Sequence, residues 1–595
     1  MARTQPPGDA APHPARARPL LVDAARHSPV HTSAVLILSA ISAAAAVALP
    51  GVLGMTLDRA LGAADGLHRA VTLCALLIVV EVVSDALVAF LSGVTSARST
   101  ARIRRRGVAH LLNIEPRRAA DHFTVGDLVT RLTSNAAEAG TAPVTVAAGA
   151  ASLLTPLGGL VALALTDLWL AAVFLAGAPL LLLLLRTFTR GSSESVTQYQ
   201  RVQAALASRL VEALGGARTI AAAGTARRER ARVLAPLAEL SAQGRRMWQV
   251  YGSAVAGSGI LVPMLITLVV AVGGIRLVAG DLSVGQLLSA TAYTSLAAGL
   301  GGVTGQLNAL LRSRSAARRT AELLAVPATR QGSTPLPAGG PGRVELRAVT
   351  VVRNGTAVLR DVDLTVPGGT VMAVVGRSGA GKSTLAAVIG RLTDPDAGEV
   401  RLDGVSLAEA DPDQLRREIG YAFERPVLFG DTVGAAIGFG PAEPTTRQIE
   451  EAARAAGAHA FVERLPGRYG APVAGVPLSG GELQRLGLAR AFAHAGRLLI
   501  LDDATSSLDS VTELHVGRAL VSDVRPGTRV LIAHRVSTAA RADLVAWIED
   551  GRIRAVGPHP VLWENAEYRA IFADPDPDPD PGSSAERGSG KEPGS

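Results

Sequence analysis

A glycine-rich stretch in the second half of the chain has the residue types and spacing of a phosphate-binding loop. Residues 376–384 are Gly-Arg-Ser-Gly-Ala-Gly-Lys-Ser-Thr, which fits the pattern G-x-x-x-x-G-K-[ST]. An apolar run, 370–375, is predicted to form a buried strand before the loop, and a segment with helical spacing, 385–392, follows it. Glycines allow the backbone to wrap closely around phosphates, and the N–H groups at a helix start attract anions. The stretch is therefore predicted to bind the phosphates of a nucleotide.

The side chains of this loop have separate expected roles. Lys382 should reach the β- and γ-phosphates, and Ser383 should place its hydroxyl on Mg²⁺. Further contacts with the nucleotide are expected from Gly376, Ser378, Gly379, Gly381 and Thr384. The chain has only one other lysine, Lys591, and uses arginine elsewhere. This usage indicates that position 382 needs a compact ammonium group.

The composition predicts a membrane protein with more than one domain. A chain of 595 residues exceeds the size of a single core, and its apolar residues, 48% of the total, come in long blocks. A single cysteine, Cys74, excludes internal disulfides and cysteine-clustered metal sites. The arginines behind the net charge of +8 flank apolar segments and form no basic stripe interleaved with aromatic residues. Membrane topology explains them, and no nucleic-acid partner is expected.

Six apolar segments are each long enough to cross a lipid bilayer. They are expected at 33–55, 70–92, 144–164, 169–185, 252–275 and 284–305. Short links alternate with two long arginine-rich stretches, 95–141 and 187–250. The positive-inside rule places both long stretches in the cytoplasm, together with both termini and the nucleotide-binding domain. We therefore expect a multi-pass protein of the cell (cytoplasmic) membrane.

Shifts in composition divide the chain into five regions. We expect a flexible cytoplasmic arm over 1–30, an all-α transmembrane domain of six helices with two long cytoplasmic loops over 31–311, a linker over 312–342, a nucleotide-binding domain over 343–573 and a disordered tail over 574–595. The linker is rich in Pro, Gly and Ser, and the tail begins with an Asp-Pro repeat that cannot build a core.

Two acidic residues lie within the second predicted span. Glu81 and Asp85 are four residues apart, so they share one helix face near the middle of the membrane. Acids at this depth are costly unless they face water or a partner. One interpretation is a substrate site, either a counter-charge for a cationic substrate or a proton site. The alternative is a structural pair that hydrogen-bonds to neighbouring helices.

Four further motifs follow the phosphate loop in a characteristic order. Residues 478–482 are Leu-Ser-Gly-Gly-Glu, and an apolar strand then ends at Asp502, where a carboxylate would hold Mg²⁺. Ser-Leu-Asp ends at Asp509, and His534 stands alone after another apolar run. This series resembles the nucleotide-binding domain of ABC transporters. Preceded by six spans with two long cytoplasmic loops, it makes residues 31–573 similar to an exporter-type half-transporter.

The resemblance implies a fold, cofactors and a partner. It implies an α/β P-loop NTPase domain of ABC type after the all-α transmembrane domain, with ATP and Mg²⁺ as cofactors. In that family two nucleotide domains meet head to tail, so a second half-transporter chain is implied. Ser479, Gly480 and Gly481 would aim backbone N–H groups at the partner's γ-phosphate, and Glu482 stands on the outer side of the motif, where glutamine is usual. Asp509 resembles the residue that communicates between the two sites, and His534 resembles the one that contacts the γ-phosphate and the attacking water.

Three positions depart from the family pattern. The catalytic base, normally glutamate, is Asp503, whose side chain is one methylene shorter, and a displacement of about 1 Å can cost about a hundredfold in rate. The Q-loop glutamine is replaced by Glu424, which can still approach Mg²⁺ but cannot donate a hydrogen bond while ionised. The aromatic residue that stacks on adenine is replaced by Arg353, whose guanidinium can also stack on a base.

The family pattern also changes in the parts that connect the two domains. The stretch before the Leu-Ser-Gly-Gly motif is short and has Val473 where an acid is usual. Within the long cytoplasmic stretches, 117–127 and 215–224 are the candidates for the coupling helices.

We therefore expect ATP-driven export of an unknown small molecule or peptide by a dimer of half-transporters. One alternative is an ATP-binding regulatory or gating membrane subunit that hydrolyses little ATP, which the three departures favour. Another is an importer on the same fold. Because the departures fall on the site of this chain's own phosphate loop while the Leu-Ser-Gly-Gly motif is intact, a heterodimer is favoured over a homodimer.

Overall fold

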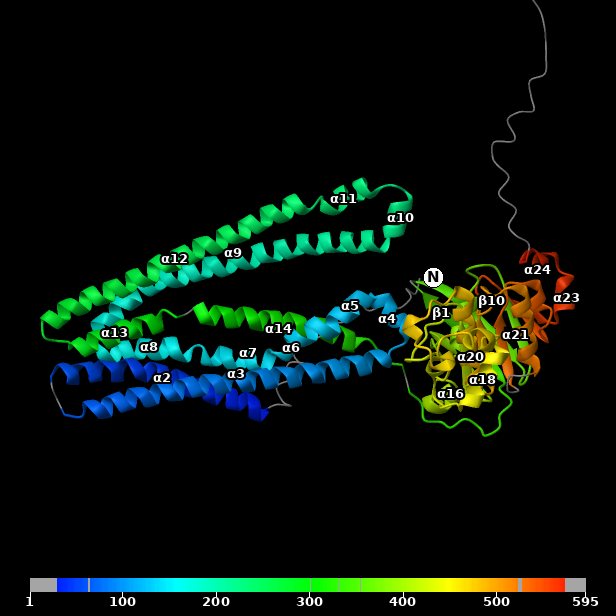
Figure 1. Cartoon of the computed structure of the whole chain (residues 1–595), viewed down its shortest axis with the longest axis horizontal. Helices are drawn as coiled ribbons and strands as arrows, with labels where there is room; N and C mark the ends of the chain where they lie inside the picture. The colour runs from blue at the N-terminus through cyan, green and yellow to red at the C-terminus, as the bar shows by residue number, and fades with distance from the viewer. Residues whose placement is uncertain are drawn as a thin grey trace, which may run out of the picture. The chain divides into compact units, whose positions relative to one another are not determined.

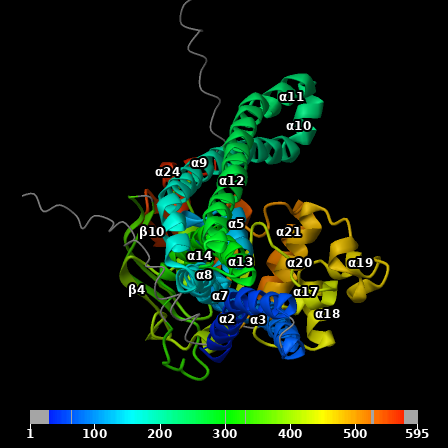
Figure 2. The same cartoon turned by 90° about the vertical axis from the view of Figure 1, so that its left-hand side faces the viewer.

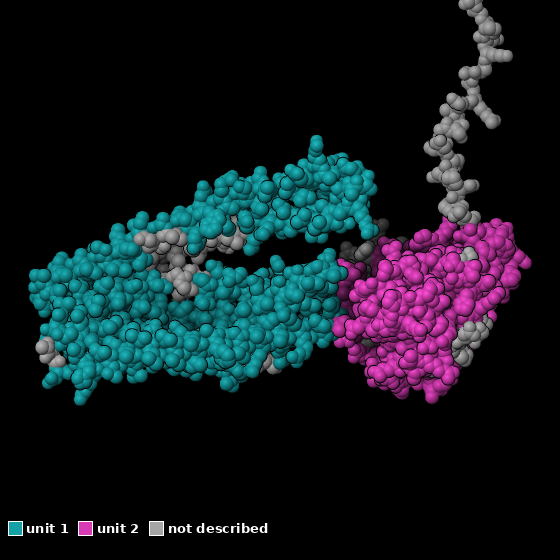
Figure 3. All heavy atoms as spheres, in the orientation of Figure 1, with its two compact units in different colours: residues 1–111, 123–326 teal, residues 112–122, 327–595 magenta. Residues whose placement is uncertain are grey.

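The computed structural model describes residues 29–572, except 63–64, 300, 330, 354 and 523–526. The chain divides into two compact units (Figure 3). The first comprises residues 1–111 and 123–326, and the second comprises 112–122 and 327–595. The predicted tail lies outside the described residues, as does the predicted arm apart from its last two residues.

The described part of the first unit is helical, which confirms the predicted class of the membrane domain. In chain order its helices are α2 (Pro29–Leu61), α3 (Leu67–Leu112), α5 (Val125–Thr130), the π-helix η1 (Arg131–Asn135), α6 (Ala136–Gly140), α7 (Ala142–Ala151), α8 (Leu154–Thr166), α9 (Leu168–Gly215), α10 (Ala217–Ala222), α11 (Ala226–Leu234), α12 (Leu237–Val278), α13 (Val284–Ala297) and α14 (Gly301–Ala325). Helices α9 and α12 lie side by side, with α10 and α11 at their ends (Figures 1 and 2).

Among the described residues, four stretches are helical, long and apolar enough to cross a membrane. They are Pro29–Leu61, Leu67–Leu112, Val125–Thr166 and Ile260–Val278, and a shorter apolar stretch covers Leu168–Leu180. The last predicted span, 284–305, is divided between α13 and α14. The count of six spans therefore stays a prediction. Large apolar side chains on α3, such as Leu76, Val82 and Phe90, are more than half exposed, which suits a lipid environment.

Two carboxylates fix helix turns in the first unit. Asp167 caps α9 by accepting from the backbone N–H groups of Trp169 and Leu170, and it also pairs with Arg276 of α12 at 2.8 Å. Asp58 of α2 accepts from the N–H of Gly285 at 2.8 Å, close to the start of α13. Both turns are thus held by charges that satisfy free N–H groups at helix starts.

The second unit is an α/β domain, as predicted. Its strands are β1 (Val344–Arg353), β2 (Thr356–Val366), β3 (Val371–Val375), β4 (Ala397–Leu402), β5 (Val405–Ser406), β6 (Ile419–Phe423), β7 (Leu498–Asp502), β8 (Thr528–Ile532), β9 (Leu544–Glu549) and β10 (Arg552–Gly557). One sheet has the order β10-β9-β3-β8-β7-β6 and is parallel except for the edge strand β10. The other, β2-β1-β4-β5, is antiparallel.

Helices complete the second unit. They are α4 (Pro116–His122), α15 (Lys382–Ile389), α16 (Pro412–Glu418), α17 (Val433–Ile437), α18 (Thr446–Ala455), α19 (His459–Val462), α20 (Gly480–Ala493), α21 (Ser510–Ser522), α22 (Val536–Ala539), α23 (His559–Trp563) and α24 (Ala566–Ala570). A core that includes Met372, Leu385, Ile389, Val400 and Ile500 surrounds α15. This packing fixes the helix that follows the phosphate loop.

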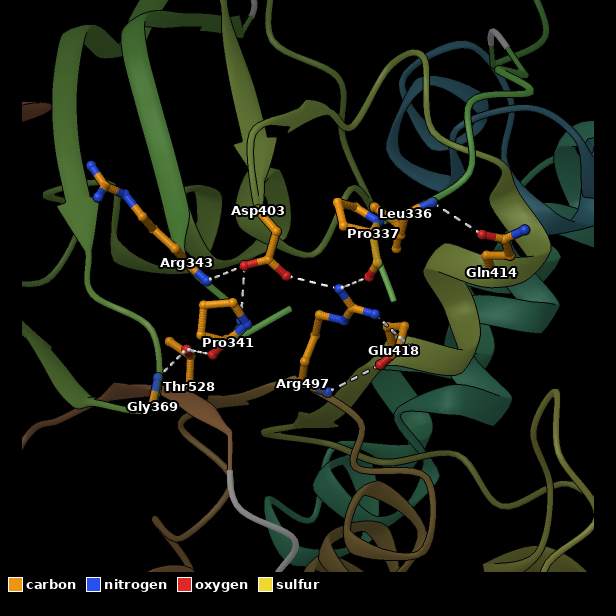
Figure 4. Close-up of polar contacts among 11 residues, drawn as sticks. Leu336, Pro337, Pro341, Arg343, Gly369, Asp403, Gln414, Glu418, Arg497 and Thr528 are labelled. Atoms are coloured by element: carbon orange, nitrogen blue, oxygen red, sulfur yellow. Dashed lines mark hydrogen bonds and ion pairs between the residues drawn. The ribbon is translucent and has the colours of Figure 1, made fainter. Parts of the chain in front are cut away.

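The predicted linker has two parts in the structure. Helix α14 continues through its first half to Ala325, and the second unit begins at Pro327. Figure 4 shows how the later part is held: Arg497 donates to the carbonyl of Pro337 at 2.9 Å and pairs with Asp403 at 2.8 Å. Gln414 accepts from the N–H of Leu336 at 3.0 Å. Hydrogen bonds therefore fix this part of the chain to the rest of the second unit.

Candidate nucleotide site

The predicted phosphate loop lies between β3 and α15, at the carboxyl end of a central parallel strand. Its glycines lie where the backbone has a positive φ or where a neighbouring strand leaves no room for a side chain. Gly379 and Gly381 have φ of 81° and 105°, a region that glycine enters without strain. A Cβ at Gly376 would collide with the carbonyl of Ile548 on β9. The loop conformation thus requires glycine at the positions where the sequence has it.

Lys382 is buried at the centre of this loop. Its Nζ donates to the carbonyls of Gly376 at 2.7 Å and Arg377 at 3.0 Å. Burial lowers the pKa of Lys382, while the nearby carboxylates of Asp503 and Asp502 oppose that shift. Ser383 is exposed next to it and Thr384 is buried, so the lysine and the serine hydroxyl occupy the same end of α15.

Asp502 ends β7 and has one oxygen that suits a cation. Its Oδ2 accepts from the hydroxyl of Tyr421 at 3.3 Å, whereas Oδ1 is buried without a hydrogen-bond partner among the described residues. An unpartnered buried carboxylate oxygen is costly. It is also the kind of ligand that Mg²⁺ prefers. The residues present therefore fit a magnesium ion held by Asp502 and Ser383, which would neutralise phosphate charge when bound.

Asp503 and His534 lie close together beside this carboxylate. Their Oδ2 and Nε2 atoms are 3.8 Å apart. Burial raises the pKa of Asp503, His534 counteracts that shift, and the negative charges of Glu424 and Asp502 add to it. Asp503 has a φ of 51°, a left-handed conformation that aspartate tolerates better than most residues. The structure thus brings the predicted base, the predicted histidine and the Q-loop acid to one site.

Glu424 itself is half exposed and lies 3.7 Å from Arg425. Its backbone carbonyl accepts from Nε2 of Gln484, a residue of α20 that the sequence analysis did not single out. Gln484 is buried, donates to Ser506 Oγ at 3.0 Å and accepts from the N–H of Ser507 at 2.9 Å. One amide therefore connects the Q-loop, α20 and the segment after Asp503. No local spacing pattern marks it; a polar residue on an otherwise apolar helix face is the only available signal.

The Leu-Ser-Gly-Gly-Glu stretch starts α20 with a capping box. Ser479 Oγ accepts from the N–H of Glu482 at 3.3 Å, and Glu482 Oε2 accepts from the N–H of Ser479 at 2.9 Å. The backbone hydrogen bond from Ser479 lowers the pKa of Glu482. Glutamate in place of the usual glutamine therefore serves this capping role. Gly480 and Gly481 form the first turn, which leaves their N–H groups without intrahelical partners.

Asp509 precedes α21 and is engaged locally. Its carboxylate accepts from the N–H groups of Val511 at 3.0 Å and Thr512 at 2.8 Å. The hydrogen bonds from Thr512 lower its pKa. The residue is thereby fixed at the start of the helix.

Arg353 contacts a residue from the segment before α4. Its Nη2 lies 3.5 Å from Oε1 of Glu115, whose side chain is only 7% exposed. Helix α4 overlaps the first predicted coupling segment, 117–127, and its Arg117 donates to Thr384 Oγ1 at 3.4 Å. The second candidate segment contains α10. Neither Glu115 nor Arg117 follows a recognisable motif, because each contact joins residues far apart in the chain.

The two acids predicted within the second span, Glu81 and Asp85, lie on α3. Asp85 accepts from the hydroxyl of Ser42 on α2 at 2.7 Å. This contact is of the kind that the structural interpretation expects, although it leaves the charge of Glu81 unexplained.

Comparisons with known proteins agree with this architecture. The model of the ABC transporter transmembrane region matches residues 32–299, and the ABC transporter model matches 359–506. The ABC transporter ATP-binding protein RamA of Streptomyces coelicolor is 52% identical over 573 residues, which cover 94% of this chain and 90% of the relative. The ATP-dependent lipid A-core flippase of Chromobacterium violaceum is 34% identical over 78% of this chain and 80% of its own length. The mitochondrial potassium channel ATP-binding subunit of Homo sapiens is 33% identical over 74% and 62%.

Proposed function

Because this chain belongs to the ABC transporter family, we propose that it is one half of a dimeric exporter that uses ATP to move a substrate out of the cell. Family membership makes the chain a multi-pass membrane protein whose ATPase domain is coupled to transport. The outward direction is supported by the likeness to a lipid A-core flippase. The cytoplasmic membrane and a cytoplasmic nucleotide domain are supported by the arginine-rich long stretches.

One observation carries this proposal. Three separate segments supply Lys382, the adjacent acids Asp502 and Asp503, and His534, which gather beside a glycine loop at the carboxyl end of a parallel sheet. In this arrangement Lys382 would bind phosphate oxygens, Asp502 and Ser383 would hold Mg²⁺, and His534 would position the attacking water against the γ-phosphate. The Leu-Ser-Gly-Gly stretch of the partner would close over ATP held by this loop.

A second function has some support. A regulatory or gating subunit would bind ATP at the same loop and hydrolyse little of it. The likeness to a mitochondrial potassium channel ATP-binding subunit and the three departures, Asp503, Glu424 and Arg353, favour it. The intact start of α20 and the approach of His534 to Asp503 favour a transporter that takes part in hydrolysis.

We also propose that the partner is a different chain. Asp503, Glu424 and Arg353 all belong to the site on this chain's own phosphate loop, whereas Ser479 and its neighbours complete the partner's site. In a homodimer both sites would carry every departure. In a heterodimer the partner's site hydrolyses ATP and the site on Lys382 holds it.

Transport can be tested with membrane vesicles from cells that produce this chain naturally. Inside-out vesicles receive a soluble extract of the same cells with or without ATP, and the retained compounds are identified by mass spectrometry. The expected result is at least one compound that accumulates only with ATP in wild-type vesicles and not with Lys382→Ala. Because Lys591→Ala changes the only other lysine, it is the matched control and should transport normally. Accumulation only in right-side-out vesicles that were loaded with ATP would indicate import, and no ATP-dependent accumulation in either kind of vesicle would favour the gating subunit.

A further inference from the structure

We propose that Tyr421 is a positioning residue of the magnesium site: its hydroxyl holds one oxygen of Asp502 so that the other oxygen faces the cation. The inference rests on the proposed function, because that function assigns Mg²⁺ to Asp502. It adds a residue that no motif of the chain contains. The starting observation is the division of the Asp502 carboxylate, in which Oδ2 accepts from Tyr421 at 3.3 Å and the buried Oδ1 accepts from no described residue.

The sheet places the two side chains on one face. Strands β6 and β7 are parallel neighbours, and Tyr421 is paired with Ile500, two residues before Asp502. Because side chains alternate along a strand, Tyr421, Ile500 and Asp502 point to the same side. The phenol then extends along this face toward the carboxyl end of β7. The contact therefore follows from strand register and does not depend on a flexible loop.

The ring of Tyr421 is held from two directions. A Cβ on Gly390, the residue after α15, would lie 3.0 Å from the ring carbons Cδ2 and Cε2. On the same strand, the Phe423 ring has its centroid 4.5 Å from that of Tyr421 at an interplanar angle of 32°. A ring confined in this way keeps its hydroxyl in one place. The glycine at 390 is thus needed for close packing between the phosphate-loop helix and this tyrosine.

The protonation state of Tyr421 suits a hydrogen-bond donor. A tyrosine hydroxyl has an ordinary pKa of about 10, so it carries its proton at neutral pH and can donate it to a carboxylate oxygen. A neutral donor holds a carboxylate oxygen without competing with Mg²⁺ for charge.

The contact with Tyr421 should favour Mg²⁺ binding because it restricts the rotation of the Asp502 carboxylate. A carboxylate that is free to rotate presents its two oxygens in many orientations, and binding a metal must then select one of them. Partners that orient a metal ligand typically contribute 10- to 100-fold to metal affinity. Tyr421 supplies such a partner through an O–H group, while Asp502 keeps its full negative charge for the cation.

The test compares Tyr421→Phe with the wild-type full-length chain in lipid nanodiscs. Binding of a fluorescent N-methylanthraniloyl-ATP is titrated with Mg²⁺, and binding in EDTA is measured separately. We expect the Mg²⁺ midpoint to rise about 10-fold in Tyr421→Phe while binding in EDTA stays unchanged. The matched control, Tyr469→Phe, removes a hydroxyl that contacts His459 at 2.8 Å elsewhere in the same unit, and it should leave the midpoint unchanged.

Three outcomes would contradict the inference in different ways. An unchanged Mg²⁺ midpoint in Tyr421→Phe would overturn it outright. Equal losses of binding with Mg²⁺ and in EDTA would also overturn it, because they would show a purely structural role. If the wild-type chain itself shows no effect of Mg²⁺ on nucleotide binding, the proposed function fails, and the inference fails with it.

Discussion

Glu115 and Arg353 form a contact between the segment before α4 and the end of β1, with 3.5 Å between Oε1 and Nη2. Arg353 stands at the position that resembles the adenine-stacking residue, and its Nε and Nη2 atoms are buried without hydrogen bonds among the described residues. Helix α4 follows α3 and precedes α5 in the chain. Arg353, which is expected to stack on adenine, is therefore paired with a segment that is continuous in the chain with the membrane helices.

This contact predicts that Glu115→Gln strengthens nucleotide binding. Removing the carboxylate releases Arg353 to stack on the base, and an exposed cation–π contact is worth about 0.5–1 kcal/mol, which corresponds to about a two- to fivefold gain in affinity. The measurement is equilibrium binding of ATP to the full-length chain.

The matched control for this prediction is Glu399→Gln, because Glu399 pairs with Arg401 at 2.7 Å on the surface of the same sheet. It should leave the affinity unchanged. Weaker binding in Glu115→Gln would show that the ion pair supports nucleotide binding. It would contradict a competition between Glu115 and the nucleotide base for Arg353.

Substitution of Gln484 should disconnect the motifs of the nucleotide site from one another. Gln484→Leu removes three hydrogen bonds that join α20 to the Q-loop and to Ser506 and Ser507. Buried polar groups left without partners cost about 1–3 kcal/mol. We expect a lower melting temperature and at least a tenfold loss of ATPase activity in the assembled transporter, with ATP binding retained.

Gln448→Leu is the control for this substitution. Gln448 is exposed and belongs to the capping box of α18, so its loss should affect stability slightly and ATPase activity not at all. If both variants lose activity equally, Gln484 has no special role in connecting the motifs.

The negative charge of the α3 acids and the hydrogen bond between Ser42 and Asp85 can be tested separately. Asp85→Asn keeps an acceptor for Ser42 but loses the charge, whereas Ser42→Ala keeps the charge but loses the bond. If the acids line the pathway, Glu81→Gln with Asp85→Asn should weaken binding of tetraphenylphosphonium while basal ATPase activity is retained. Ser42→Ala should then bind this cation normally. The structural interpretation predicts the reverse, with a loss of folded protein in Ser42→Ala and unchanged binding in the double variant.

The sequence was most informative where residues close in the chain act together. The strand before the phosphate loop and the helix after it were predicted from a local pattern, and β3 and α15 confirm them. The class of both domains is confirmed as well. The assignments of individual site residues, such as Asp502 and His534, stay predictions with a geometry that suits them.

Contacts between distant segments could not be predicted in this way. Tyr421 meets Asp502 only because β6 and β7 are neighbours in the sheet, and Glu115 meets Arg353 only because residues 112–122 fold with the second unit. No periodicity in a single sequence encodes such pairings. The division of the final apolar segment between α13 and α14 was missed for a related reason, because hydropathy alone does not locate a break between two helices.

The variant Asp503→Glu tests whether side-chain length limits hydrolysis at this site. The longer side chain restores the reach of the usual base, so we expect a gain in ATPase activity of the chain alone of about 10- to 100-fold. The left-handed φ of 51° is less favourable for glutamate, which should cost some stability. Asp550→Glu, at a φ of 48° in a turn distant in the chain, measures that backbone cost without altering the site. No gain in Asp503→Glu would mean that side-chain length does not limit this site.

The central claim, that the site on this chain's phosphate loop holds ATP and hydrolyses it slowly, is tested most directly by the ATPase turnover of the purified chain without any partner. We predict a turnover far below about 1 s⁻¹, the lower end of the usual enzyme range, together with retained ATP binding that Lys382→Ala abolishes. A turnover of about 1 s⁻¹ or faster that is lost in Asp503→Asn would show that Asp503 is a competent base. It would contradict the unequal sites and remove the reason for an unlike partner.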